Sequence, residues 1–262
     1  MSTQSSKRSG ANNSSSKEEE FALTKQHWTK TDHSDFSKFL NTLGDSRYRE
    51  FNKKVTATQR QMIGIRVPIL RAMSKNILKG NFEEFLQFPP DTYEDVLLRG
   101  FVIGGLPYQT MLQHFDSFLP LMDSWGISDT FCATLKSIKK NQDDFYTQKL
   151  QALLSPTAPE YFLRLGVVIL LNYYVDSAHI SLVFDMLNSD SAQRNEYYVA
   201  IAVAWLVAEC LAKFSTVSLQ WFRRNTLPVW THNKAISKAC ESNSVTAAMK
   251  QKLRALRRVE KE

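Results

Sequence analysis

A succession of apolar stripes at helical spacing constrains the fold of this chain more than any other feature. Phe36, Phe39, Leu40 and Leu43 follow one another at three- and four-residue intervals, which places them on one face of a helix. Similar stripes fill almost the whole chain from Glu20 onward. The breaks between them are short, and no alternating strand pattern lies in the breaks. The sequence therefore predicts an all-α protein.

Proline and glycine mark where several of the expected helices begin and end. Pro68 opens one helix, and Gly80 with Asn81 closes it, as proline and a left-handed cap commonly do. The remaining helices are expected at residues 91–103, 108–122, 128–138, 143–154, 159–174, 177–187, 193–214, 217–225, 230–239 and 245–258. Helix pairs would then recur about every 40 residues, the period of HEAT-like repeats. We predict a HEAT-like helical repeat solenoid with a concave surface for a partner; an irregular helical bundle is the alternative.

The amino-terminal segment differs from the rest of the chain. Residues 1–20 are rich in Ser, Asn, Gly and charge, with almost no apolar side chains. Such a segment cannot bury enough surface to offset its ordering entropy, so it is predicted to be a disordered tail. Residues 21–262 are predicted to form a single HEAT-like domain.

Net charge and cysteine content indicate which kind of partner and which cellular compartment to expect. The formal net charge of +7 favours a polyanionic partner, although a merely basic surface gives the same number. The three cysteines, Cys132, Cys210 and Cys240, include no CxxC pair and support neither a disulfide framework nor a zinc site, so a reducing cytoplasm or nucleus is expected. The longest apolar run, residues 165–171, is too short to span a membrane.

Common catalytic signatures are missing from the sequence. The histidines show no metal-ligand spacing, and no GxxxxGK[ST], GxGxxG, HExxH or GxSxG pattern occurs. These patterns respectively mark phosphate loops, dinucleotide sites, zinc sites and nucleophile elbows. No metal and no cofactor is therefore expected.

Four residues form a candidate site. Trp125 precedes Asp129 by four residues, Arg164 opens an apolar stretch, and Trp205 lies inside another. In a stack of helices these side chains can converge on one concave wall, where aromatic faces and a carboxylate suit a cationic group on a polyanion. A structural interpretation accounts for each of them too. Asp129 suits a helix first turn capped by Ser128, both indoles suit packing, and Arg164 suits a pair with Asp129 or Glu209.

The last forty residues are the most basic part of the chain. Lys234, Lys238, Arg254, Arg257 and Arg258 are the cations there that we expect to contact DNA. Lysine and arginine release counterions from a nucleic-acid backbone, which makes such binding strongly salt-dependent. The alternative is that these cations only form a helix face exposed to water, which has the same composition.

The order of these motifs resembles a known family from Phe36 to Arg258. The segment at residues 64–71, Gly-Ile-Arg-Val-Pro-Ile-Leu-Arg, is followed by Trp125 with Asp129, by Arg164 and by Ala-Trp-Leu at 204–206. Thr-His-Asn-Lys-Ala-Ile at 231–236 and Leu-Arg-Ala-Leu-Arg-Arg at 253–258 complete the series. In this order they resemble the DNA alkylation repair proteins built from HEAT-like repeats, the AlkD-like DNA glycosylase superfamily. Residues 123–132 look closer to a divergent branch, whose members keep the fold without assured alkylpurine activity.

The resemblance implies that the concave surface of the HEAT-like solenoid is a DNA-binding surface. It also implies a monofunctional glycosylase that excises cationic N3- or N7-alkylated purines from double-stranded DNA. Trp125 and Trp205 would pack against the deoxyribose, and Asp129 would oppose the oxocarbenium-like transition state and position water. Arg164 would hold a backbone phosphate, and the base need not be flipped into a pocket. We expect a monomer that does not engage membranes. A non-catalytic solenoid that reads DNA shape is the second hypothesis, and a protein-binding helical scaffold is the third.

Overall fold

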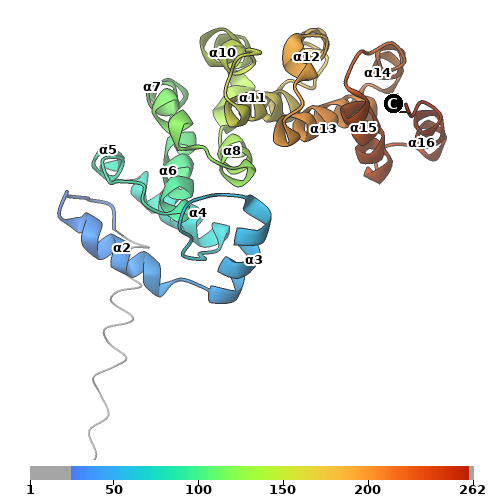
Figure 1. The fold of residues 1–262 in the computed structure, drawn as a ribbon. Helices are drawn as coiled ribbons and strands as arrows, with labels where there is room; N and C mark the ends of the chain where they lie inside the picture. The colour runs from blue at the N-terminus through green and yellow to red at the C-terminus, as the bar shows by residue number, and fades with distance from the viewer. Residues whose placement is uncertain (1–24, 260–262) are drawn as a thin grey trace, which may run out of the picture. The chain divides into compact units, whose positions relative to one another are not determined.

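The chain folds into helices throughout the part that the structure, a computed structural model, describes. Residues 25–259 are described, and their regular elements are all helical apart from one isolated bridge between Gln61 and Thr92 (Figure 1). The all-α prediction is therefore confirmed. The predicted disordered tail, residues 1–20, lies outside the described residues. The described chain divides into two compact units, one up to Phe118 and one from Leu119 onward. The sequence predicted a single domain over this range.

The first unit is built around an aromatic cluster. Its helices are α2 (Asp32–Thr42), α3 (Ser46–Thr56), α4 (Val67–Ile77), α5 (Phe82–Phe85), α6 (Tyr93–Gly105) and α7 (Tyr108–Phe118). The buried indole of Trp28 meets Phe36, Phe85 and Phe88 edge to face, with ring centroids 5.2, 5.3 and 5.8 Å away. Edge-to-face contacts of this kind add to the hydrophobic gain of burying the rings.

A buried carboxylate organises the loop that enters α4. Glu94, at the start of α6, is only 1% exposed. Its carboxylate accepts hydrogen bonds from the backbone N–H groups of Ile63, Gly64 and Ile65 at 2.9, 2.7 and 3.2 Å. Gly64 has a φ of 98°, and a methyl group on it would stand 2.4 Å from the carbonyl oxygen of Asp45. A glycine is needed there for the loop to wrap around the carboxylate.

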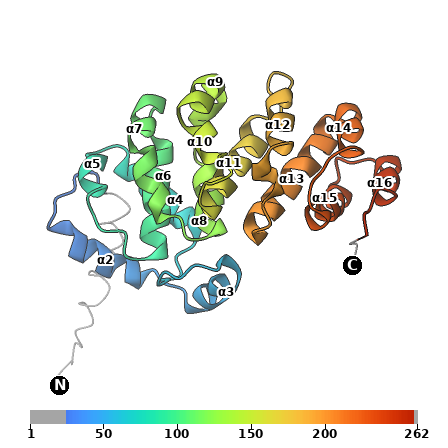
Figure 2. The same cartoon turned by 45° about the horizontal axis from the view of Figure 1, so that its top comes forward.

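The second unit consists of two rows of helices (Figures 1 and 2). Its α-helices are α8 (Trp125–Cys132), α9 (Gln142–Phe145), α10 (Gln151–Leu153), α11 (Glu160–Tyr173), α12 (Ile180–Leu187), α13 (Tyr197–Lys213), α14 (Ser215–Phe222), α15 (Val229–Glu241) and α16 (Ala247–Arg254). Helices α8, α11, α13 and α15 pack side by side in that order, while α10, α12 and α14 form the other row. Helices α11, α13 and α15 begin at residues 160, 197 and 229, at shorter intervals than the ~40 residues predicted from the sequence.

The start of α8 differs from the prediction. The helix begins at Trp125 rather than Ser128, after an extended Ser124, and a separate 3₁₀ turn follows at Lys136–Lys140. Ser128 is therefore inside the helix, where its hydroxyl donates to the Trp125 carbonyl at 3.3 Å and to Asp129 Oδ1 at 3.2 Å. Asp129 lies one turn into the helix, so the capping interpretation is wrong for both residues. The serine bonds backward instead, as serines inside helices often do.

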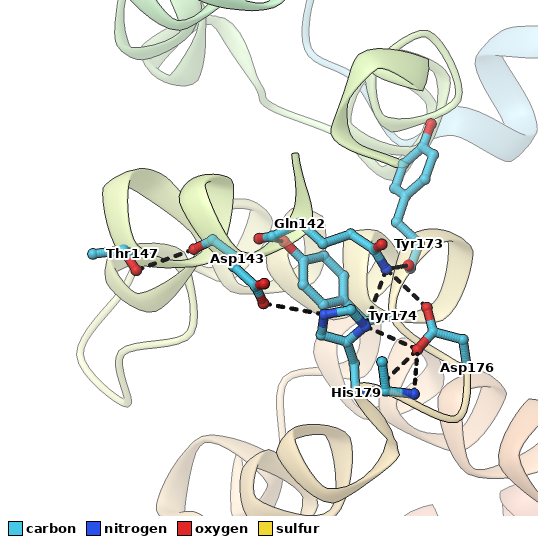
Figure 3. Close-up of polar contacts among 8 residues, drawn as sticks. Gln142, Asp143, Thr147, Tyr173, Tyr174, Asp176 and His179 are labelled. Atoms are coloured by element: carbon cyan, nitrogen blue, oxygen red, sulfur yellow. Dashed lines mark hydrogen bonds and ion pairs between the residues drawn. The ribbon is translucent and has the colours of Figure 1, made fainter. Parts of the chain in front are cut away.

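A histidine between two carboxylates joins α9 to the turn before α12 (Figure 3). His179 Nδ1 lies 2.8 Å from Asp176 Oδ1, and Nε2 lies 3.2 Å from Asp143 Oδ1. Gln142 Nε2 donates to Asp176 Oδ2 at 2.8 Å, and the Tyr174 hydroxyl donates to the Gln142 carbonyl at 2.6 Å. Partial burial favours a lower pKa for His179, but the hydrogen bonds and negative charges of Asp176 and Asp143 outweigh it and raise the pKa.

Replacing Glu94 with Ala is expected to lower the free energy of unfolding by at least about 3 kcal/mol, since three buried N–H groups lose their acceptor and each unsatisfied donor costs about 1–3 kcal/mol. Urea unfolding of wild type and variant measures the difference. Glu84→Ala, at an exposed position on α5, is the matched control and is expected to stay within about 0.5 kcal/mol of wild type. An equally small effect of Glu94→Ala would contradict the role assigned to the carboxylate.

Replacing His179 with Gln is expected to destabilise the protein more at acid than at alkaline pH. Because the pKa of His179 is raised above its ordinary value of 6.5, its stabilisation is full below that value and disappears as pH rises through the raised pKa. We expect a loss of up to about 1 kcal/mol at about pH 5.5 and a smaller loss at about pH 9. Urea unfolding at both pH values checks this, with His27→Gln, an exposed histidine, as control. Equal losses at the two pH values would contradict the assigned pKa shift.

Candidate functional site

A fully buried arginine joins three neighbouring helices of the second unit. Arg164, on α11, is 1% exposed. Its Nε and Nη2 donate to the two carboxylate oxygens of Asp129 on α8, at 2.9 and 2.7 Å. Its Nη1 donates to the carbonyl oxygen of Tyr198 on α13, at 2.6 Å. The paired geometry is the strongest that a guanidinium and a carboxylate form.

Two aromatic rings complete the surroundings of this guanidinium. Arg164 Cζ lies 5.5 Å from the ring centroid of Trp205 and 6.0 Å from that of Tyr198. Both rings belong to α13, where Trp205 follows Tyr198 by seven positions, so they lie on one face of the helix two turns apart. Aromatic faces attract a guanidinium, and these two therefore help to hold Arg164 where it meets Asp129.

The carboxylate of Asp129 is held in place yet open to solvent. Its side chain is 21% exposed, whereas that of Arg164 is 1% exposed. Trp125, which is half-buried, precedes it by four residues on α8 and so shares its side of the helix. Each carboxylate oxygen has more than one acceptor site, so the bonds to Arg164 leave Asp129 able to face a ligand.

Lysines of α15 extend the site. Lys238 Nζ lies 5.9 Å from the ring centroid of Trp205 and also pairs with Glu241 at 2.8 Å. Lys234, one turn earlier on the same face, lies 5.9 Å from the ring of Trp230. Helix α15 packs directly against α13. Lys238 is thus held beside the indole that also contacts Arg164, and Lys234 is held beside a second indole, on α15 itself.

The structure brings together Trp125, Asp129, Arg164, Trp205 and Lys238 as neighbours on α8, α11, α13 and α15, but it changes the role of Arg164. Each of its three nitrogens donates a hydrogen bond inside the protein, and the side chain is buried. The side chain therefore does not present its charge to a backbone phosphate, contrary to the phosphate contact that the family resemblance implies. Of the two structural partners considered, Asp129 is correct, since Glu209 pairs with Lys213 at 2.9 Å.

The carboxy-terminal cations divide into two kinds. Arg254 and Arg257 are exposed, with Arg257 Nη2 donating to Ser237 Oγ at 3.0 Å. Arg258 instead donates to the carbonyl oxygens of Leu227 and Asn225 at 2.9 and 2.5 Å. It connects the loop before α15 to the chain after α16. Arg258 was predicted to contact DNA, and these bonds give it a structural role instead.

Four aromatic side chains near the site were missed by the sequence analysis. They come from the amino-terminal turns of three adjacent helices: Tyr161, Tyr197, Tyr198 and Trp230. Two of them, Tyr197 and Trp230, are exposed. The consecutive tyrosines at 197 and 198, with Trp205 seven residues further on, were a signal of an aromatic helix face.

Other chemistries receive little support from the described residues. In the described range, no group of three or more His, Cys, Asp or Glu side chains is placed to hold a metal ion. Burial raises the pKa of Cys132 and of Cys210 to about 12, so neither thiol is a ready nucleophile at neutral pH. Between residues 25 and 259, no helix combines the length and apolarity that crossing a membrane requires.

The sequence matches no protein-family model and no curated protein. Function therefore has to be inferred from the residues of the site.

Replacing Arg164 with Met is expected to lower the free energy of unfolding by about 3 kcal/mol, the lower part of the range for breaking a buried ion pair, because water can reach Asp129. Chemical denaturation of the variant measures this loss. Arg164→Lys is expected to recover only part of it, since an ammonium cannot form the paired hydrogen bonds. The matched control is Lys213→Met, which breaks an exposed pair and is expected to change stability by less than about 1 kcal/mol. Equal effects of the two Met substitutions would refute a special role for Arg164.

Proposed function

We propose that this protein is a DNA glycosylase that releases cationic N3- or N7-alkylated purines by hydrolysing the N-glycosidic bond. The observation that carries the proposal is the Asp129 carboxylate, which a buried guanidinium holds in one orientation while a fifth of its side chain remains open to solvent. An anion fixed in advance stabilises positive charge without reorganising during the reaction. Trp205, whose ring lies 5.5 Å from the same guanidinium, adds an aromatic face.

The proposed reaction needs few protein groups. As the bond between C1′ and the purine nitrogen breaks, its electron pair passes to the cationic base, which leaves neutral, and positive charge develops on the sugar. Asp129 opposes that charge, a water molecule attacks C1′, and the proton that this water loses passes to the solvent that reaches the partly exposed Asp129. The leaving base needs no protonation, so no general acid is required. Nor does the reaction require the base to be flipped into a deep pocket.

Cations near the site suit a DNA backbone. Lys234 and Lys238 lie on one face of α15, and Arg254 and Arg257 are exposed on and just after α16. Together with the formal net charge of +7, they favour double-stranded DNA as partner, bound by a monomer in a salt-dependent way. In this proposal the two rows of helices form a HEAT-like solenoid whose α8–α11–α13–α15 row faces the DNA.

The Asp129–Arg164 pair also favours a second candidate. Its two charges largely compensate one another, and a compensated carboxylate opposes a developing cation less strongly than a lone one. The second candidate is a non-catalytic protein that recognises damaged or branched DNA by shape and phosphate contacts. It shares the lysines and arginines of the first proposal and differs in that no base is released.

Base release from duplex DNA carrying N7-methylguanine separates the two candidates. Wild type is expected to release the base, and Asp129→Asn to release it at least about 100-fold more slowly, the effect of removing a group that stabilises transition-state charge. Asp185→Asn, at an exposed position on α12, is the matched control and is expected to keep the wild-type rate. DNA binding by Asp129→Asn, followed by fluorescence anisotropy, is expected to be retained, and its thermal unfolding shows that the variant is folded.

Each other result has a definite meaning. Binding by wild type without base release would sink the glycosylase and favour the shape-reading protein. A folded Asp129→Asn with full activity would remove Asp129 from the mechanism. Absence of DNA binding at low salt would overturn both candidates and leave the protein-binding scaffold.

A further inference from the structure

Four aromatic rings form a continuous row across three helices of the second unit. Tyr161 on α11 contacts Tyr198 on α13, with ring centroids 5.8 Å apart. Tyr198 contacts Tyr197 at 5.1 Å, and Tyr197 contacts Trp230 on α15 at 5.7 Å. We call these four side chains the aromatic row. Its members stand at or near the amino-terminal ends of α11, α13 and α15, so the side-by-side packing of these helices creates it.

The outer half of the aromatic row is exposed. Tyr197 is 55% and Trp230 is 40% exposed, although large aromatic side chains are usually buried. The two rings touch each other, so they present one joint surface rather than two scattered ones. A contiguous exposed aromatic surface is typical of a binding site.

The charges around the row identify the end that suits an anion. Lys234 lies 5.9 Å from the Trp230 ring. Trp230, Lys234 and Arg257 share, with Asn233 and Ser237, a surface hollow of about 230 Å³. At the opposite end, burial raises the pKa of Tyr161, and the negative charge of the nearby Glu160 adds to the rise. The end at Trp230 is therefore the cationic one.

The aromatic row reaches the candidate site through Tyr198. The Tyr198 carbonyl accepts a hydrogen bond from Arg164 at 2.6 Å, and the Tyr198 ring lies 6.0 Å from Arg164 Cζ. A strand held at Asp129 would thus have the aromatic row beside it. Rings combined with nearby cations are what proteins use to bind unpaired bases, since every base has a face that stacks and a phosphate that carries charge.

We propose that the aromatic row binds unpaired bases of a DNA strand by stacking, while Lys234 and Arg257 contact its phosphates. The inference rests on the proposed DNA partner but does not require base excision. It adds a preference that the function above lacks: a duplex with a single-stranded extension binds more tightly than the same duplex with blunt ends. Tyr197 and Trp230 supply that preference.

The test uses two duplexes of equal sequence, one blunt and one with a single-stranded extension containing 2-aminopurine, whose fluorescence is quenched on stacking. Wild type is expected to quench the probe and to bind the extended duplex more tightly. Tyr197→Ala and Trp230→Ala are each expected to weaken that binding about tenfold, the loss typical of one stacked base, with binding to the blunt duplex less affected. Trp230→Phe keeps a ring and is expected to restore most of the quenching. Val217→Ala, at a 43% exposed position on α14, is the matched control.

The outcomes separate this inference from the proposed function. Equal binding of both duplexes by wild type, without quenching, would overturn the stacking role and leave the DNA partner intact. Quenching that survives in both Ala variants would also overturn it, because the bases would then stack elsewhere. No binding to either duplex would overturn the DNA partner itself, and the aromatic row would then suit a protein segment.

Discussion

The second unit depends on finding partners for one buried guanidinium. A charged group at 1% exposure is strongly destabilising unless its hydrogen bonds are satisfied. Arg164 satisfies them with the Asp129 carboxylate on one neighbouring helix and the Tyr198 carbonyl on the other. Helices α8, α11 and α13 can therefore pack only in a register that brings these three groups together. Apolar contacts alone would tolerate a sliding of one helix along another.

The same bonds shape the chemistry that we assign to the site. Holding a carboxylate from its buried side fixes its orientation and spares the reorganisation that a free side chain needs. The guanidinium also compensates part of the charge that would act on a developing cation. A fixed but partly compensated anion suits a reaction whose leaving group is already cationic, because the substrate supplies much of the driving force. It would serve poorly for a neutral base.

Sequence reasoning found the elements better than the contacts between them. The apolar periodicity and Pro68 placed most helices, since these signals are local. The start of α8 was missed because Ser128 looked like a cap, whereas its hydroxyl bonds backward to Trp125. Arg164 stood out by its apolar surroundings, but the choice between Asp129 and Glu209 depends on which helices are adjacent. The aromatic row was missed because its members come from three helices, and the sequence alone does not show that the starts of those helices lie side by side.

Helix α15 connects the two surfaces to which we assign function. Lys234 and Lys238 are one turn apart, about 6 Å along the helix, and each ammonium lies 5.9 Å from an indole. A lysine on a bare surface gives up much of its conformational freedom when it binds a phosphate. These two are already restrained, Lys238 beside the Trp205 of the candidate site and Lys234 beside the Trp230 of the aromatic row. A DNA strand bound along α15 would therefore contact both the Asp129 carboxylate and the aromatic row. The spacing between these two contacts would then fix how far along the strand an unpaired base lies from a damaged one.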